Sequence, residues 1–137
     1  MSERTLLEMF IELNSDSIDE EGIRLPNSFL KTTDEKLVVM ALDMSSGVTF
    51  LYQAIRRTMA AHPPRELVFG FDRFAKPDQG TTLGDLLSVH HFDGKAWRFG
   101  VMEYRHEPRL VLPVNWSNEW WGPRLADETA KCLRITV

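Results

Sequence analysis

Charged and titratable side chains flank two predicted chain reversals that we expect at one end of a sheet. The loop 75–84 leaves a predicted strand over Leu67–Phe74, and the turn His106–Pro108 follows a predicted strand that ends at Tyr104. If these strands are neighbours, the two reversals lie side by side, and loops on a rigid scaffold are where binding residues gather. The residues that we predict to bind a ligand there are Arg73, Lys76, Asp85, Glu103, Arg105 and His106.

The residue types at this sheet end suit a small anionic ligand. Two arginines could hold an anionic group through charge-assisted hydrogen bonds, and His106 with Asp85 or Glu103 could form an acid–base pair. The alternative is a set of solvated surface ion pairs, each contributing about 0–1 kcal/mol to stability. Both interpretations stay open, and no catalytic residue can be assigned.

A second candidate surface is aromatic. Trp116, Trp120 and Trp121 are three of the four tryptophans of the chain, and their spacing puts them on one helical face if the segment turns. Buried together, they would clamp the last helix to the sheet. Exposed, they would form a hot spot for a protein partner. Asn115, Asn118 and Glu119 beside them would then form a polar rim.

The familiar motifs of catalytic and cofactor sites are missing from the sequence. Gly80 and Gly84 have neither the P-loop lysine nor the dinucleotide-binding spacing, and Cys132 lies on a predicted amphipathic helix, where an unreactive thiol is expected. His90 and His91 point to opposite faces of their strand and cannot share a metal ion unless the strand bulges. We therefore expect no cofactor and no metal, and we interpret His90 as a core histidine.

The clearest local structure is a β-hairpin. Asp93-Gly94 separates Leu83–Phe92 from Lys95–Tyr104, and an Asp-Gly pair between apolar strands favours a two-residue turn. That turn would place Phe92 opposite Lys95 and His90 opposite Trp97.

The pattern of apolar residues in the rest of the sequence predicts further helices and strands. Ser2 is expected to cap a first helix that ends near Asn14. Ile23–Glu35 is expected to be irregular because Pro26 interrupts it. The remaining predicted elements are a strand at Leu37–Met44, a helix at Gly47–Ala61, a strand at Leu110–Val114 and a helix at Pro123–Leu133. The sum is an α+β fold, with a mostly antiparallel sheet of about five strands and three helices packed mainly on one face.

Composition narrows the class of protein. We expect 137 residues with 43% apolar content to form a single globular domain spanning residues 1–137. The lone Cys132 favours a reducing, cytoplasmic compartment. Glu3, Glu8 and Glu12 interrupt the first apolar stretch, so no secretory signal is expected. The net charge of −4 argues against a duplex nucleic-acid partner, and no apolar run is long enough to cross a membrane.

These observations favour a non-enzymatic binding or accessory module that acts on a protein partner. The alternative is a small hydrolase or transferase that acts on a polar anionic substrate at the Arg73, Asp85, Glu103 and His106 end of the sheet. A structural subunit of a homo-oligomer is a third option. The binding surfaces that we predict are the Trp116–Trp121 segment and the loop 75–84.

Overall fold

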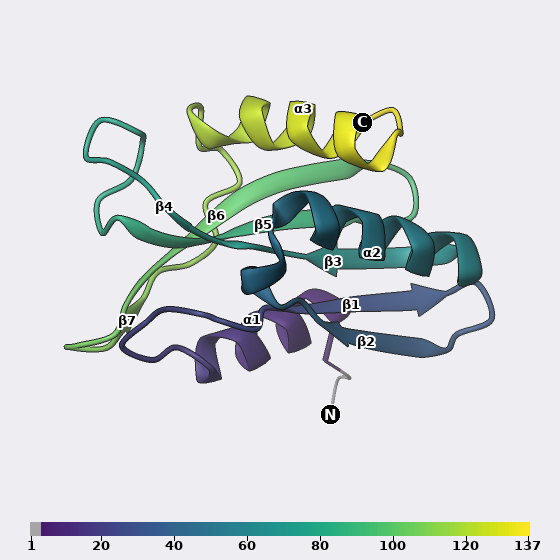
Figure 1. The fold of residues 1–137 in the computed structure, drawn as a ribbon, viewed down its shortest axis with the longest axis horizontal. Helices are drawn as coiled ribbons and strands as arrows, with labels where there is room; N and C mark the ends of the chain where they lie inside the picture. The colour runs from purple at the N-terminus through teal and green to yellow at the C-terminus, as the bar shows by residue number, and fades with distance from the viewer. Residues whose placement is uncertain (1–3) are drawn as a thin grey trace.

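The computed structural model of the chain describes residues 4–137 and has an α+β architecture of three α-helices and a seven-stranded sheet (Figure 1). A single 3₁₀ turn, η1 (Met44–Ser46), precedes the second helix. In chain order the helices and strands are α1 (Leu6–Asp16), β1 (Asn27–Thr32), β2 (Leu37–Ala41), α2 (Val48–Ala61), β3 (Pro64–Phe69), β4 (Asp72–Phe74), β5 (Asp85–Phe92), β6 (Trp97–Arg105), β7 (Leu110–Val111) and α3 (Trp121–Leu133).

The strands form one antiparallel sheet in the order β2-β1-β3-β5-β6-β7, and β4 continues the line of β3 along β5. Because β2 and β3 both run antiparallel to β1, they are parallel to each other, and α2 makes the crossover between them. The predicted α+β class is confirmed, with more strands than the five or so that were expected.

The additional strand that matters most is β1, in a segment that we expected to be irregular. Its residues alternate poorly in polarity, yet Phe29, Leu30 and Thr32 are buried because β1 lies inside the sheet, between β2 and β3. Pro26 does not prevent this, since it lies just before the strand and its carbonyl accepts the Leu42 amide.

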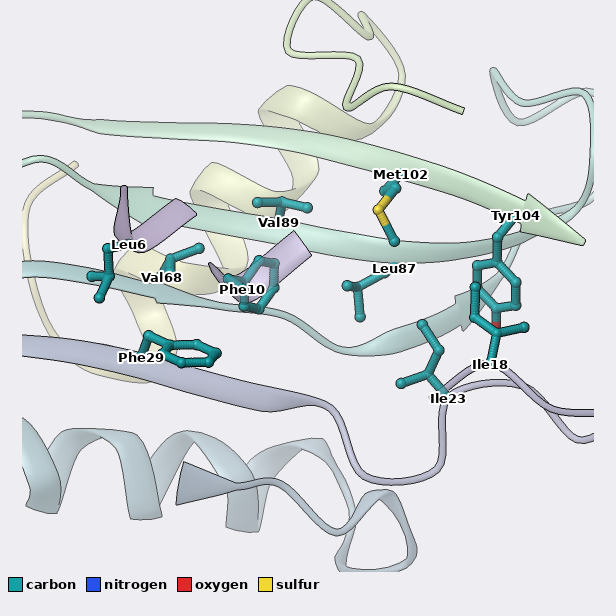
Figure 2. Close-up of a cluster of buried hydrophobic side chains, with 10 residues drawn as sticks. All are labelled: Leu6, Phe10, Ile18, Ile23, Phe29, Val68, Leu87, Val89, Met102 and Tyr104. Atoms are coloured by element: carbon teal, nitrogen blue, oxygen red, sulfur yellow. The ribbon is translucent and has the colours of Figure 1, made fainter. Parts of the chain in front are cut away.

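Both faces of the sheet are covered by helices. Leu6 and Phe10 of α1 pack against one face, where Val68, Leu87 and Val89 complete a buried cluster (Figure 2). Helices α2 and α3 cover the opposite face, which has two apolar clusters. The larger of the two includes Leu51 of α2, Phe69 of β3 and Leu133 of α3. We call these surfaces the α1 face and the α3 face.

The hairpin between β5 and β6 forms where the Asp-Gly pair predicts it, but with a longer loop. Phe92 pairs with Trp97 and His90 with Phe99, so the predicted register was wrong by two residues. The carboxylate of Asp93 accepts hydrogen bonds from the amides of Lys95 and Ala96, which stabilises the wider turn. Because the shift is an even number, every side chain keeps the face that was predicted for it.

The start of α1 is capped by Thr5, whose side chain accepts a hydrogen bond from the Glu8 amide. The predicted cap at Ser2 lies outside the described residues. Across residues 4–137, no helix is long and apolar enough to cross a bilayer.

Candidate functional site

The charged residues predicted at one sheet end do share that end, but they divide between its two faces. Arg73 pairs with Leu86 and Leu86 with Glu103, which places both charged side chains in one row on the α3 face. Asp72 and Asp85 point to the α1 face.

The Arg73 side chain is bonded to helix α3 of the same chain. Its guanidinium forms a two-pronged ion pair with Glu128 of α3, and the Arg73 side chain is only 16% exposed. The Nε group donates to Ser88 Oγ at 3.1 Å, and the guanidinium carbon lies 5.4 Å from the ring centre of Phe71. Arg73 therefore links β4, β5 and α3.

Ser88 and His90 continue this contact into the core. Ser88 Oγ accepts hydrogen bonds from the Phe71 amide and from Arg73, which occupies both of its lone pairs. Its single hydrogen then goes to His90 Nε2 at 2.9 Å, the shorter of its remaining contacts. His90 Nε2 is therefore an acceptor, and Nδ1 carries the hydrogen and donates to Thr129 Oγ1 at 2.8 Å.

Helix α3 and helix α2 close the set of bonds into a ring. Thr129 Oγ1 contacts the Tyr52 hydroxyl at 3.4 Å, and that hydroxyl donates to Glu128 Oε1 at 2.7 Å. Glu128 is ion-paired with Arg73, the residue from which this set of contacts begins, so the contacts form a closed ring. We call these six residues the polar ring: Tyr52, Arg73, Ser88, His90, Glu128 and Thr129.

The polar ring has the composition of a catalytic site but the environment of a structural one. Ser88, His90 and Thr129 are completely buried, and His90 stacks on Phe69 with ring centres 4.5 Å apart. Burial, and secondly the Arg73 charge, hold the pKa of His90 well below its ordinary value. A neutral imidazole with both nitrogens bonded to hydroxyl groups cannot take a proton from a substrate.

The other predicted residues lie on loops or at strand ends: Lys76 and His106 on loops, Asp85 at the start of β5, and Glu103 and Arg105 at the end of β6. Glu103 accepts hydrogen bonds from the amides of Thr82 and Leu83, so it holds the loop 75–84. Arg105 donates to the Pro108 carbonyl, within its own turn. Lys76, Asp85, Arg105 and His106 are exposed.

Asp72 is a carboxyl group at this end whose acidity is altered. The Tyr104 hydroxyl donates to Asp72 Oδ1, on the α1 face. Partial burial raises the pKa of Asp72 to about 6, against the opposing effect of the bond from Tyr104. The carboxyl group therefore gains its proton within the mildly acidic range.

The three neighbouring tryptophans lie on opposite faces of the sheet, so they do not form one cluster. Trp116 packs on the α1 face, where the Arg98 guanidinium lies 3.9 Å from its ring centre. Gly100 makes room for it, since a Cβ there would lie 2.9 Å from the Trp116 ring. Trp121 is buried on the α3 face, and Trp120 is half-buried beside it, with ring centres 4.9 Å apart.

Asn118 organises the chain between these tryptophans. It is 7% exposed and lies in the turn directly before α3, where its carbonyl accepts the Gly122 amide. Its Oδ1 accepts the amides of Trp120 and Trp121 at 3.0 and 2.8 Å, the pattern of bonds that a capping residue makes. Its Nδ2 donates to the Gly80 carbonyl at 2.7 Å. One side chain therefore begins α3 and ties the loop 75–84 to it.

These contacts create a pocket between the two segments that the sequence pointed to. It measures about 550 Å³ and opens widely to solvent. Its lining residues are Asp78, Gly80, Asn115, Ser117, Asn118, Glu119, Trp120 and Arg124. Gly80 permits the close approach, because a Cβ there would lie 2.8 Å from Trp120 Cβ and its φ is +76°. We call this the loop–α3 pocket.

The Trp120 and Arg124 side chains form the main feature of the pocket. The Arg124 guanidinium carbon lies 3.6 Å from the Trp120 ring centre, and Arg124 also donates to the Trp120 carbonyl. Arg124 is exposed, and stacking on the indole holds it in place.

Sequence reasoning missed several residues that build this region. Ser88 carried a signal, because a polar side chain on a predicted core face must find a partner. Glu128 and Thr129 lie on the last predicted helix, but nothing in the spacing reveals that they meet Arg73 and His90. Arg124 follows Trp120 by four residues, a helical spacing that brings side chains together.

Comparisons of the chain with family models, curated proteins and solved structures find no match.

The raised pKa of Asp72 predicts a specific pH dependence. Between its ordinary pKa of 3.8 and about 6, the folded state keeps a proton that the unfolded state has released. The free energy of unfolding of the native protein should therefore fall, relative to Asp72→Asn, as the pH rises through this window. Denaturant unfolding at a series of pH values measures the difference. Asp127→Asn, on the exposed side of α3, controls for the loss of a carboxylate elsewhere on the surface; a curve for Asp72→Asn that runs parallel to that of the native protein would contradict the assignment.

The double role of Asn118 can be separated by two variants. Asn118→Asp keeps the oxygen that caps α3 but loses the donor to Gly80, so amide exchange in residues 79–82 should accelerate while global stability stays near that of the native protein. Asn118→Ala loses both contacts and should lower the free energy of unfolding by about 1 kcal/mol. Hydrogen-exchange mass spectrometry and denaturation measure the two effects. Unchanged loop exchange in Asn118→Asp would show that the contact to Gly80 does not hold the loop.

Proposed function

We propose that the protein is a non-catalytic binding module that recognises a protein partner through the loop–α3 pocket. The observation that carries this proposal is the Arg124 guanidinium stacked on the half-buried Trp120 ring, at the mouth of a pocket of about 550 Å³. Tryptophan and arginine are, with tyrosine, the residue types enriched among binding hot spots.

The geometry of the pair supports recognition because both side chains are held before a partner arrives. The Trp120 ring packs edge-on against the buried Trp121 ring, and Arg124 is bonded to the Trp120 carbonyl. Ordering long side chains at an interface costs free energy, and this cost is reduced where they are already ordered. The guanidinium has five N–H donors, so it can also bind a carbonyl or carboxylate of the partner.

The rim of the pocket suits a protein surface. Asn115, Ser117 and Glu119 surround the aromatic pair with polar groups, and a polar rim around an aromatic centre is the usual anatomy of a protein interface. The wide opening fits a partner side chain or loop better than a small molecule, which needs most of its surface enclosed.

No specific observation favours the alternative of a small enzyme at the Arg73 end of the sheet. Arg73 and Glu103 are engaged by Glu128 and by the loop amides. His106 lies exposed at a turn. A polar anionic substrate at this end therefore stays a prediction from the sequence.

A reducing, cytoplasmic location belongs to the same proposal. Cys132 is a free thiol whose pKa is raised, mainly by burial, which makes it a poor nucleophile. Such a thiol is compatible with a compartment that keeps cysteines reduced.

The proposal can be tested by site-specific photo-cross-linking in cells that naturally produce the protein. A benzophenone amino acid placed at Ser117, which lines the pocket, should trap a defined partner; the same group at the exposed hairpin residue Lys95 is the control. Adding Arg124→Ala should remove the cross-link from position 117, and Trp120→Ala should weaken binding of the identified partner by about 30-fold or more. Phe74→Ala removes a side chain that is 70% exposed elsewhere and should leave binding unchanged. Identical cross-links from both positions, or binding that tolerates Arg124→Ala and Trp120→Ala in folded protein, would refute the proposal.

A further inference from the structure

The two edges of the sheet differ in how they are protected. Across the described residues, the edge at β7 has a strand of only two residues, and Pro108 and Pro113 flank it closely. The edge at β2 has five residues, all apolar: Leu37, Val38, Val39, Met40 and Ala41. Natural proteins usually guard an edge strand with a charge, a proline or a bulge. The β2 strand has none of these, and its pairing with β1 runs without a register shift.

Apolar side chains of β2 are also exposed to an unusual degree. Leu37 is 50% exposed and Val39 is 48% exposed. Both point to the α1 face, across from Lys31 and Phe29 of β1. Leu37 also lines a hollow of about 340 Å³ beside Leu6 and Met9 of α1.

The backbone of β2 presents a regular set of free hydrogen-bonding groups along this edge. The Lys36 carbonyl accepts the Thr32 amide and the Leu42 amide donates to the Pro26 carbonyl, so the even-numbered residues of this strand bond to β1. In an antiparallel ladder the alternate residues point the other way. The N–H and C=O groups of Leu37, Val39 and Ala41 therefore point outward.

We propose that β2 pairs with β2 of a second copy of this chain, antiparallel and about a two-fold axis at Val39. This register places Val39 opposite Val39 of the partner and Leu37 opposite Ala41 of the partner. All three outward-facing residues then form bonded pairs, giving about six hydrogen bonds. The exposed apolar side chains of both copies meet on the α1 face of the joined sheet.

A second copy fits this edge because the strand is complementary to itself. A two-fold contact requires the same patch on both subunits, and β2 is apolar at every position, so no charge meets its own copy within the strand. Pairing of two five-residue strands gives a contact at the low end of specific interfaces, below about 1,200 Å². We therefore infer a reversible dimer that forms as the concentration rises.

The dimer contact is independent of the loop–α3 pocket. Strand β2 lies at one edge of the sheet, and the pocket lies beside β6 and α3, beyond β1, β3 and β5. Each copy would keep its pocket accessible, so a dimer would offer two pockets to a partner with repeated sites.

Sedimentation over a wide range of protein concentration tests the association. The native protein should shift from monomer to dimer. Val39→Lys places two like charges face to face, and Val39→Pro removes an outward N–H without breaking a bond to β1; both should remain monomeric. The matched control, Phe74→Lys, changes an exposed apolar side chain on β4 and should dimerise like the native protein. A native protein that is monomeric at every concentration, or a Val39→Lys variant that still dimerises, would overturn the proposal.

Disulfide trapping tests the register. In a Cys132→Ser background, Val39→Cys places two thiols across the two-fold axis, where the Cα separation of about 5.5 Å permits a disulfide bond. Leu37→Cys is the matched control, because its two copies would be about 13 Å apart along the strands. Oxidation should cross-link the first variant rapidly and the second only slowly. Equal cross-linking of both, or cross-linking of Leu37→Cys alone, would show that the register is wrong.

Discussion

The contact on which the rest of the structure depends is the ion pair between Arg73 and Glu128, together with the buried hydroxyl and imidazole groups that it organises. Removing one partner of a buried polar network leaves the other unsatisfied, at a cost of several kcal/mol when a charge is involved. The polar ring therefore constrains four elements at once: β4, β5, α2 and α3. An apolar core could pack α3 at several rotations; a ring in which each group bonds specific neighbours allows a single placement.

That placement extends outward to the surface where we propose binding. Because α3 is fixed by Glu128 and Thr129, its first turn lies where Asn118 can both cap it and reach Gly80. Glu103 holds the far side of the same loop through the amides of Thr82 and Leu83. The pocket is therefore lined by a loop bonded at both sides and by a capped helix end, and the Trp120–Arg124 pair lies on the capped end.

The sequence predicts the features that depend on residues close together in the chain, and it misses those that depend on contacts between distant segments. Local signals were sufficient for the hairpin at Asp93-Gly94, for α2 and α3, and for the interpretation of His90 as a core histidine, which is buried and bonded. Strand β1 was missed because its polarity pattern reflects burial between two other strands, and the register was wrong because Asp93 supports a longer turn. The pocket joins the two segments predicted as binding surfaces, but the contact between Asn118 and Gly80 spans distant parts of the chain, and no spacing rule reveals it.

The state of the His90 ring tests the polar ring most directly, since the nitrogen that carries the hydrogen decides whether Ser88 and Thr129 donate to the imidazole or accept from it. Nitrogen-15 NMR of the imidazole distinguishes the two neutral forms and the charged form. The structure predicts that His90 stays neutral with the hydrogen on Nδ1 from neutral pH down through the range in which ordinary histidines gain a proton. A His90 signal that titrates near the ordinary value of 6.5, or one that reports a hydrogen on Nε2, would contradict the polar ring and the placement of α3 that follows from it.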